Sequence, residues 1–295
     1  MAYVCLDAFL AEHINIVGVV GPKKNHVTYI PFKNFVLSRG QNYIEYDKLS
    51  DESFIKQIKD LNVDLAVVCS FNYKIPKVLL DAVKDGFVNT HPSLLPKYRG
   101  PNPYSAVILN GEKESGMTLH LMDENFDTGD IVAQKSMQLL SKDTMGTLFN
   151  KFNMMAADMH IELLKKYEKE PFERTPQPNG DFPIAPIYQE EELFIDFSKT
   201  SSEIDRLVRS LNPFLLARCW FKANLIKVLS IECYESSSEF DAEYGEVVQI
   251  TDEKVLIKVK DGLIAITAMQ FGSFFAGSSK DFIDIVDPKV GDKFY

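Results

Sequence analysis

Three side chains suited to acyl transfer, Asn89, His91 and Asp127, lie in two short stretches of this sequence. Asn89 and His91 are two residues apart, and Asp127 lies further along in the run FDTGD at residues 126–130. No serine or cysteine nucleophile is suitably placed beside them, so we expect direct attack of an amine on a donor carbonyl. Asn89 would donate a hydrogen bond to the developing oxyanion, and His91 would transfer the proton. Asp127 would orient the imidazole of His91 and favour its charged form, which raises the pKa.

A strand predicted at residues 86–91 must position Asn89 and His91. Successive side chains of a strand point to opposite faces, so a spacing of two places both residues on the same side. Pro92 and Pro96 cannot donate to a ladder, so the strand ends at once. The pair therefore lies at the carboxyl end of a strand, where open α/β sheets bind their ligands.

The apolar periodicity predicts an α/β catalytic domain with a Rossmann-like, mostly parallel sheet at residues 1–167. The run at residues 65–69 is typical of a strand buried on both faces. Methionines on the longest helix are expected to fill the core. Helices are expected at residues 3–10, 32–39, 51–61, 77–83, 102–110 and 144–167. The other strands are expected at residues 14–20, 43–46, 116–122 and 131–139.

Residues 168–188 differ in composition from the rest of the chain. Prolines alternate there with polar residues, which is typical of a semi-rigid linker. Beyond this linker, residues 189–295 are expected to form a small, OB-like β-barrel with one helix at residues 201–211. Its strands are expected at residues 225–233, 245–250, 254–259 and 263–270.

Composition and charge exclude several classes of protein. The net charge of −10 over 295 residues argues mildly against wrapping a polyanion. No apolar run is long enough for a membrane span, and no membrane partner is expected. Asp123, Asp127 and Asp130 match no EF-hand spacing, so we expect no metal. The cysteines form no CxxC pair, which favours a reducing, cytoplasmic compartment; they are Cys5, Cys69, Cys219 and Cys233.

Each motif also has an ordinary structural explanation. An Asn-x-His run is usually incidental, and residues 127–130 could form a simple turn. Ser93 could be a hydrolase nucleophile, but no Gly-x-Ser-x-Gly elbow surrounds it. For His120, acceptor contact and packing are equally favoured. His160 lies on the longest helix, where we expect it to pack rather than react.

Together, these motifs resemble the 10-formyltetrahydrofolate-dependent formyltransferases. The runs NTH at residues 89–91, SLLP at 93–96 and FDTGD at 126–130 occur in the family's order and spacing. Residues 195–213 look like the start of the C-terminal domain of methionyl-tRNA formyltransferases. The resemblance implies 10-formyltetrahydrofolate as co-substrate, with Asn89 stabilising the transition state, His91 handling the proton and Asp127 tuning His91. It further implies folate contacts from Ile75, Ser93, Leu94, Leu95, Pro96, Asp123 and Phe126, and we assign acceptor binding to Arg99 and His120.

The sequence departs from that family in three places. Residues 1–4 align with a helix that follows the family's opening strand, so we expect the first strand to be absent. The basic loop with which the tRNA enzymes grip the acceptor stem shrinks to GPKKN at residues 21–25, which offers few phosphate contacts. His91-Pro92 and the run at residues 118–120 look more like members that act on small acceptors.

We therefore expect an N-formyltransferase acting on the primary amine of a small acceptor, such as a nucleotide-linked amino sugar. Methionyl-tRNA is the alternative acceptor, which the C-terminal domain favours. A formyltetrahydrofolate hydrolase is a further alternative, weakened because that relative typically lacks the asparagine kept here as Asn89. The last alternative is a binding module without turnover, against which the intact Asn89, His91 and Asp127 argue. The oligomeric state stays open.

Overall fold

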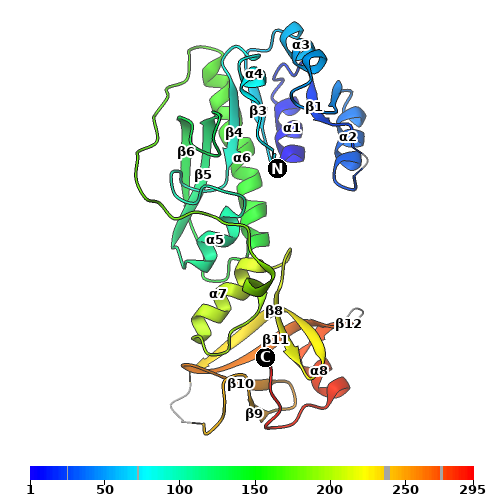
Figure 1. Cartoon of the computed structure of the whole chain (residues 1–295), viewed down its shortest axis with the longest axis vertical. Coiled ribbons are helices and arrows are strands. Elements are labelled where there is room, and N and C mark those ends of the chain that lie inside the picture. The colour runs from blue at the N-terminus through cyan, green and yellow to red at the C-terminus, as the bar shows by residue number, and fades with distance from the viewer. Residues whose placement is uncertain (25, 72, 236–239, 273–274) are drawn as a thin grey trace. The chain divides into compact units, whose positions relative to one another are not determined.

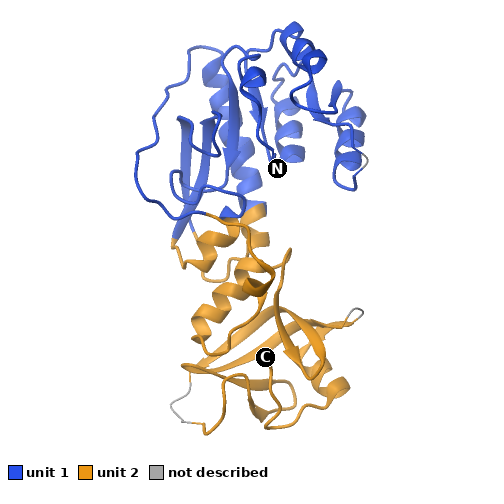
Figure 2. Cartoon of the chain, viewed as in Figure 1, with its two compact units in different colours: residues 1–103, 114–138, 150–184 blue, residues 104–113, 139–149, 185–295 orange. Residues whose placement is uncertain are grey.

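The structure, a computed structural model, describes residues 1–295 except 25, 72, 236–239 and 273–274 (Figure 1). The chain forms two compact units (Figure 2). The first contains Met1–Pro103, Glu114–Gln138 and Asn150–Ile184, and the second contains Tyr104–Lys113, Leu139–Phe149 and Ala185–Tyr295. The chain thus passes between the units several times, and residues 168–184 of the predicted linker belong to the first unit.

Two sheets form the first unit. Strands β1 (Val19–Pro22) and β2 (Tyr43–Tyr46) form a parallel pair. The second sheet has the order β3 (Ala66–Val68), β4 (Phe87–His91), β5 (Glu114–Leu121) and β6 (Ile131–Gln138). Strands β3 and β4 are parallel, and β5 and β6 are antiparallel to their neighbours. Within the described residues no ladder joins the two sheets. The absence of an opening strand stays a prediction.

The strand predicted at residues 14–20 is shorter in the structure and begins at Val19. A strand needs a partner for its backbone groups, and the ladder with β2 begins only where Val19 pairs with Tyr43. Strand β3 also differs from expectation, because Ala66 and Val67 are half-buried rather than buried on both faces. The two differences concern β1 and β3, which belong to different sheets.

Helices cover the first unit, and the long helix α6 carries much of its core. Phe152 and Met159 are buried at helical spacing, whereas Met154 on another face is 59 % exposed. Burying each such apolar side chain contributes about 1.5–3 kcal/mol. The helices within residues 1–167 are α1 (Ala2–Ala11), α2 (Tyr29–Ser38), α3 (Glu52–Asp60), α4 (Lys77–Leu80), α5 (Pro103–Leu109) and α6 (Met145–Tyr167), of which nearly all of α5 and the start of α6 belong to the second unit.

An antiparallel sheet dominates the second unit. Its order is β7 (Ala217–Phe221), β8 (Asn224–Glu235), β11 (Gly262–Phe271), β10 (Val255–Val259) and β9 (Val247–Ile250), with β12 (Phe275–Ser278) on β11. The chain end bonds to both edge strands, since Trp220 N of β7 donates to Tyr295 O at 2.7 Å and Val247 N of β9 donates to Asp292 O at 2.8 Å. Among the described strands β7 and β9 do not pair with each other, so the OB-like barrel stays a prediction.

Helix content in the second unit exceeds the prediction of one helix. Helix α7 (Ser201–Leu211) begins at the capping box of Thr200 and Glu203. A second helix, α8 (Ser279–Val286), buries Phe282, and a short 3₁₀ helix spans Glu190–Leu193. The sequence pattern missed α8, β7 and β12. Through the described part of the chain, no helix is long and apolar enough to cross a membrane.

Candidate active site

Strand β4 presents Asn89 and His91 on the same face, as the alternation of side chains predicts. In the ladder, Asn89 lies opposite Val68 of β3 and His120 of β5. Asn89 Nδ2 is 3.5 Å from Asp127 Oδ1, and His91 Nδ1 is 3.5 Å from the same oxygen. The structure therefore brings the three predicted catalytic residues together at the carboxyl end of β4.

The amide of Asn89 holds one hydrogen firmly and the other loosely. His120 Nδ1 lies 2.9 Å from Leu121 O, a carbonyl that can only accept, so Nδ1 carries the ring hydrogen. His120 Nε2 then accepts a hydrogen bond from Asn89 Nδ2 at 3.1 Å. The second hydrogen of Asn89 has the long 3.5 Å contact with Asp127. His120 is 1 % exposed and orients the amide; its contact with an acceptor stays a prediction.

The imidazole of His91 is buried with its free nitrogen toward Asp127. Nε2 donates to Tyr98 O at 2.8 Å, which leaves the lone pair on Nδ1. Burial lowers the pKa of His91, and the nearby charge of Asp127 raises it by less than burial lowers it. Asp127 thus acts in the expected direction, but the net shift is downward. Near neutral pH the imidazole is uncharged and can accept a proton.

The carboxylate of Asp127 stays ionised although the residue is largely buried. Burial alone would raise its pKa, but the contact with His120, the proximity of His91 and the hydrogen bond from Gly100 N together lower it. Gly100 N donates to Asp127 Oδ2 at 3.0 Å. The backbone of Asp127 has a φ of 57°, in the left-handed region that an aspartate tolerates better than most residues.

Gln177 hydrogen-bonds to the loop that contains Asp127, and the sequence analysis did not predict this contact. Its Nε2 donates to Asp127 O at 2.9 Å and to Gly129 O at 2.8 Å. Its Oε1 accepts from Arg99 Nε at 3.1 Å and Nη2 at 2.6 Å. The guanidinium assigned to acceptor binding is thus engaged by Gln177 in this structure. Gln177 lies between two prolines in the predicted linker, and no chemical motif marks it.

The loop after β4 is anchored by β5 and β6. Thr118 Oγ1 donates to Ser93 O at 2.6 Å and accepts from Leu95 N at 3.1 Å. Gln134 Nε2 donates to Thr118 Oγ1 at 2.8 Å and to Leu95 O at 3.0 Å. The hydroxyl of Ser93 donates to Lys97 O at 2.7 Å. The hydroxyl of Ser93 therefore stabilises the loop and is not positioned as a free nucleophile.

The residues predicted to contact folate differ in accessibility. Ile75, Ser93 and Leu95 are buried, Leu94 and Pro96 are half-buried, and Asp123 and Phe126 are exposed. Phe126 is 60 % exposed, and Lys74 Nζ lies 5.8 Å from its ring centroid. Asp123 accepts from Thr128 Oγ1 at 2.7 Å and so shapes the acidic loop. Leu94, Pro96 and Phe126 therefore have apolar surface that a ligand could reach, whereas Ile75, Ser93 and Leu95 have little accessible surface.

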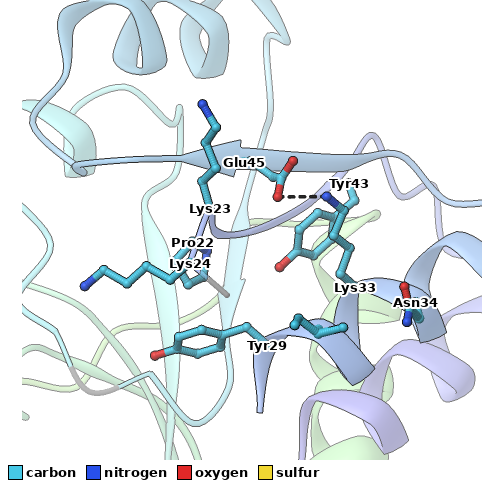
Figure 3. A pocket seen from close by; sticks show the side chains of 9 residues that line it. Pro22, Lys23, Lys24, Tyr29, Lys33, Asn34, Tyr43 and Glu45 are labelled. Carbon is cyan, nitrogen blue, oxygen red and sulfur yellow. Dashed lines mark ion pairs between the residues drawn. The ribbon is translucent and has the colours of Figure 1, made fainter. Parts of the chain in front are cut away.

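A hollow of about 500 Å³ lies among β1, β2 and α2 (Figure 3). Lys23, Lys24 and Lys33 line it together with a single carboxylate, Glu45. Glu45 pairs with Lys33 at 2.8 Å, and Lys23 lies 3.6 Å from Asp47 outside the hollow. The lysines outnumber the lining carboxylate, so the hollow suits an anion. Asn25, in the short basic loop, lies outside the described residues.

No group of three His, Cys, Asp or Glu in the described ranges could hold a metal ion. The proposed proton and oxyanion chemistry requires none, since an amide, an imidazole and a carboxylate supply it. The absence of a metal stays a prediction.

Comparison with known proteins identifies the family. Residues 13–164 match the formyl transferase family and residues 187–284 match the formyl transferase C-terminal domain. The methionyl-tRNA formyltransferase of Clostridioides difficile is 33 % identical, over 92 % of this chain and 89 % of that protein. The methionyl-tRNA formyltransferase of Lactiplantibacillus plantarum is 32 % identical, over 90 % of this chain and 86 % of that protein.

Solved structures share the fold at lower identity. HypX from Aquifex aeolicus in complex with tetrahydrofolic acid has a TM-score of 0.63 at 20 % identity, covering 88 % of this chain and 45 % of that one. The N-formyltransferase from Helicobacter canadensis has a TM-score of 0.58 at 20 % identity, covering 90 % and 94 %. The matched region includes Asn89, His91 and Asp127. This chain belongs to the family of folate-dependent formyltransferases.

Proposed function

We propose that this protein transfers the formyl group of 10-formyltetrahydrofolate to the amine of methionyl-tRNA. The observation that carries the proposal is the 33 % identity to a methionyl-tRNA formyltransferase over 92 % of the chain, which includes the C-terminal unit. The sequence alone favoured a small amine, such as a nucleotide-linked amino sugar. These relatives favour the alternative, tRNA, and the geometry of the site serves either acceptor.

Asn89 supplies the hydrogen bond to the oxyanion in this mechanism. The amine attacks the formyl carbon and the carbonyl oxygen gains negative charge. The loosely held N–H of Asn89 turns from its 3.5 Å contact with Asp127 to that oxygen. His120 keeps the other hydrogen of the amide at 3.1 Å and fixes the plane of the side chain. The donor is thus oriented before the reaction begins.

His91 moves the proton between the two nitrogens. Its Nδ1 has a lone pair because Nε2 donates to Tyr98 O. The attacking amine gives its proton to Nδ1, and the imidazolium is stabilised by Asp127 at 3.5 Å. The same proton then passes to the nitrogen of tetrahydrofolate as the carbon–nitrogen bond breaks. No net proton is consumed, so the pair is ready for another cycle.

The folate co-substrate is proposed to contact the residues that the sequence predicts. The half-buried Leu94 and Pro96 and the exposed ring of Phe126 each offer apolar surface to a planar aromatic ring. Asp123 at the edge of the acidic loop can accept hydrogen bonds from amino groups. These contacts are proposed from the accessibility of the residues.

The lysines of the hollow supply phosphate contacts for tRNA. In a plot of log binding constant against log salt concentration, each Lys–phosphate contact makes the slope more negative by about 0.9 at most. With Lys23, Lys24 and Lys33 alone, this unit contributes a slope of about −2 to −3. That is a modest salt dependence for a nucleic-acid enzyme, in keeping with the net charge of −10.

Formyl transfer from 10-formyltetrahydrofolate tests the proposal directly. Methionyl-tRNA is compared with a panel of nucleotide amino sugars, and formate release without acceptor is measured alongside. Rapid product with methionyl-tRNA is expected. Product with a sugar alone would replace tRNA by a small acceptor, formate without acceptor would identify a hydrolase, and no turnover would identify a binding module. The four free thiols are in keeping with a proposed cytoplasmic location.

A further inference from the structure

Lys74 and Lys24 connect the predicted folate residues to the hollow among β1, β2 and α2. Lys74 directly precedes Ile75, and its Nζ lies 5.8 Å from the ring centroid of Phe126. Tyr73 precedes Lys74, and Lys24 Nζ lies 5.9 Å from the centroid of the Tyr73 ring. Lys24 in turn lines the hollow. A row of cationic and aromatic side chains thus runs from Phe126 to the hollow, all of it in the first unit.

The two ammonium groups of this row are accessible to an anion. Among the described residues neither Lys24 nor Lys74 forms an ion pair, and both side chains are exposed. Each lies over an aromatic ring, which attracts an exposed cation only weakly. Lys33, by contrast, pairs with Glu45 at 2.8 Å, and the ammonium of Lys24 points away from that pair (Figure 3). A ligand can therefore bind Lys24 and Lys74 without breaking an ion pair.

The chemistry of this row suits the glutamate tail of folate. A folate ends in a glutamate, and further glutamates can be joined through their γ-carboxyl groups, so that each one adds a carboxylate. Carboxylates form charge-assisted hydrogen bonds with ammonium groups. The hollow of about 500 Å³ exceeds the space that one carboxylate needs and is within the range of small-molecule sites. Asp123 and Glu124, in the loop of Phe126, repel an anionic tail and so favour a path along Lys74.

We propose that the poly-γ-glutamate tail of 10-formyltetrahydrofolate binds along this row, with its first carboxylates at Lys74 and later ones at Lys24 and in the hollow. The inference rests on the proposed use of this co-substrate. The formyl group must reach Asn89, so the charged glutamate end points outward, past the ring of Phe126, which is 60 % exposed. Lys24 then serves the co-substrate as well as a tRNA phosphate, and these two roles can be separated by experiment.

Binding of 5-formyltetrahydrofolate, a stable isomer of the donor, measures the contribution of the tail. Dissociation constants are determined by isothermal titration calorimetry for the mono-, tri- and pentaglutamate at low and high salt, without an acceptor. We expect the dissociation constant to fall about tenfold from mono- to pentaglutamate, as a few exposed ion pairs provide. This gain should shrink at high salt because exposed charges are screened. Equal affinity for the three ligands, or a gain that salt does not change, would overturn the proposal.

Lysine variants test the path of the tail. Lys24→Ala should reduce the gain from added glutamates about threefold and leave the affinity for the monoglutamate unchanged, because only a long tail reaches the hollow. Lys74→Ala should weaken the binding of all three forms. Lys77→Ala is the matched control, since Lys77 is an exposed lysine of the same segment that pairs with Asp81 at 2.8 Å. It should keep the full dependence on tail length. A Lys24→Ala protein that loses affinity equally for short and long tails would refute the path.

Activity measurements separate this inference from the proposed function. If Lys24 binds only a tRNA phosphate, Lys24→Ala will raise the KM for methionyl-tRNA and leave the dependence on tail length intact, which would refute the tail site. A protein that binds the pentaglutamate more tightly but transfers no formyl group would refute the proposed function and support the tail site. No binding of any of the three folates would overturn both.

Discussion

Replacing Gln177 by alanine should slow formyl transfer without removing any group that touches the reacting atoms. Gln177 donates to the carbonyls of Asp127 and Gly129 at 2.9 and 2.8 Å. Each neutral hydrogen bond contributes about 1 kcal/mol net. The left-handed backbone of Asp127 costs about 1–2 kcal/mol, which these bonds offset. Losing both therefore leaves the Asp127 loop about 2 kcal/mol less favourable in its active position.

A loss of this size predicts a decrease of about thirtyfold in kcat/KM, since 1.36 kcal/mol corresponds to tenfold. Gln177→Glu separates the two halves of the contact. Its carboxylate still accepts from Arg99 but cannot donate to the carbonyls of Asp127 and Gly129. Gln177→Glu should therefore be at least as slow as Gln177→Ala.

The assay is steady-state formyl transfer, with urea unfolding measured in parallel. Gln138→Ala is a matched control, because Gln138 is exposed at the end of β6, where its Nε2 donates to Glu114 at 3.2 Å. It should change neither the rate nor the free energy of unfolding beyond about 0.5 kcal/mol. A Gln177→Glu enzyme within twofold of the original rate would refute the argument that these two carbonyl contacts position Asp127.

Three further predictions follow from the same site. Asn89→Ala should lower kcat by about a hundredfold or more, as loss of an oxyanion donor does, with unchanged urea unfolding; a near-normal rate would remove Asn89 from the mechanism. Asp127→Asn should slow transfer and move the acid limb of the pH–rate profile to lower pH, because the charge of Asp127 raises the pKa of His91; a limb moved upward would contradict this. Burial makes the pKa of His91 lower in the folded protein than in the unfolded chain, where it is about 6.5. The free energy of unfolding should therefore fall as the pH drops from about 6.5 through the pKa of the folded state. In urea titrations, His91→Gln should lose that part of the pH dependence.

The placement of Asn89 and His91 was predictable because it depends on local rules, whereas their catalytic role stays a prediction. The alternation of a strand places Asn89 and His91 on one face, and proline ends the strand beside them. The structure confirms that placement through the contacts of both side chains with Asp127. The α/β fold and the antiparallel C-terminal unit were likewise readable from apolar periodicity. These features need only neighbours within a few residues.

The residues that the sequence reasoning missed depend on distant segments. Gln177 meets Asp127 across 50 positions, along an extended proline-rich path that carries no periodicity. Thr118 and Gln134 anchor the loop after β4 by a cross-strand pairing that only the register determines. The pKa of His91 was also out of reach, because burial is a property of the packed structure and here outweighs the nearby carboxylate.

The two faces of β4 show how one local rule directs neighbouring residues to different partners. Alternation turns Asn89 and His91 toward Asp127 and Thr90 toward His160, which lies 70 positions further along the chain. The partners on each face are supplied by tertiary packing, so Thr90 contacts the buried His160 on α6 while its two neighbours contact Asp127. Val68 pairs with Asn89 and also accepts the hydrogen bond of Thr90, so contacts on both faces of β4 fix the backbone that holds Asn89 and His91.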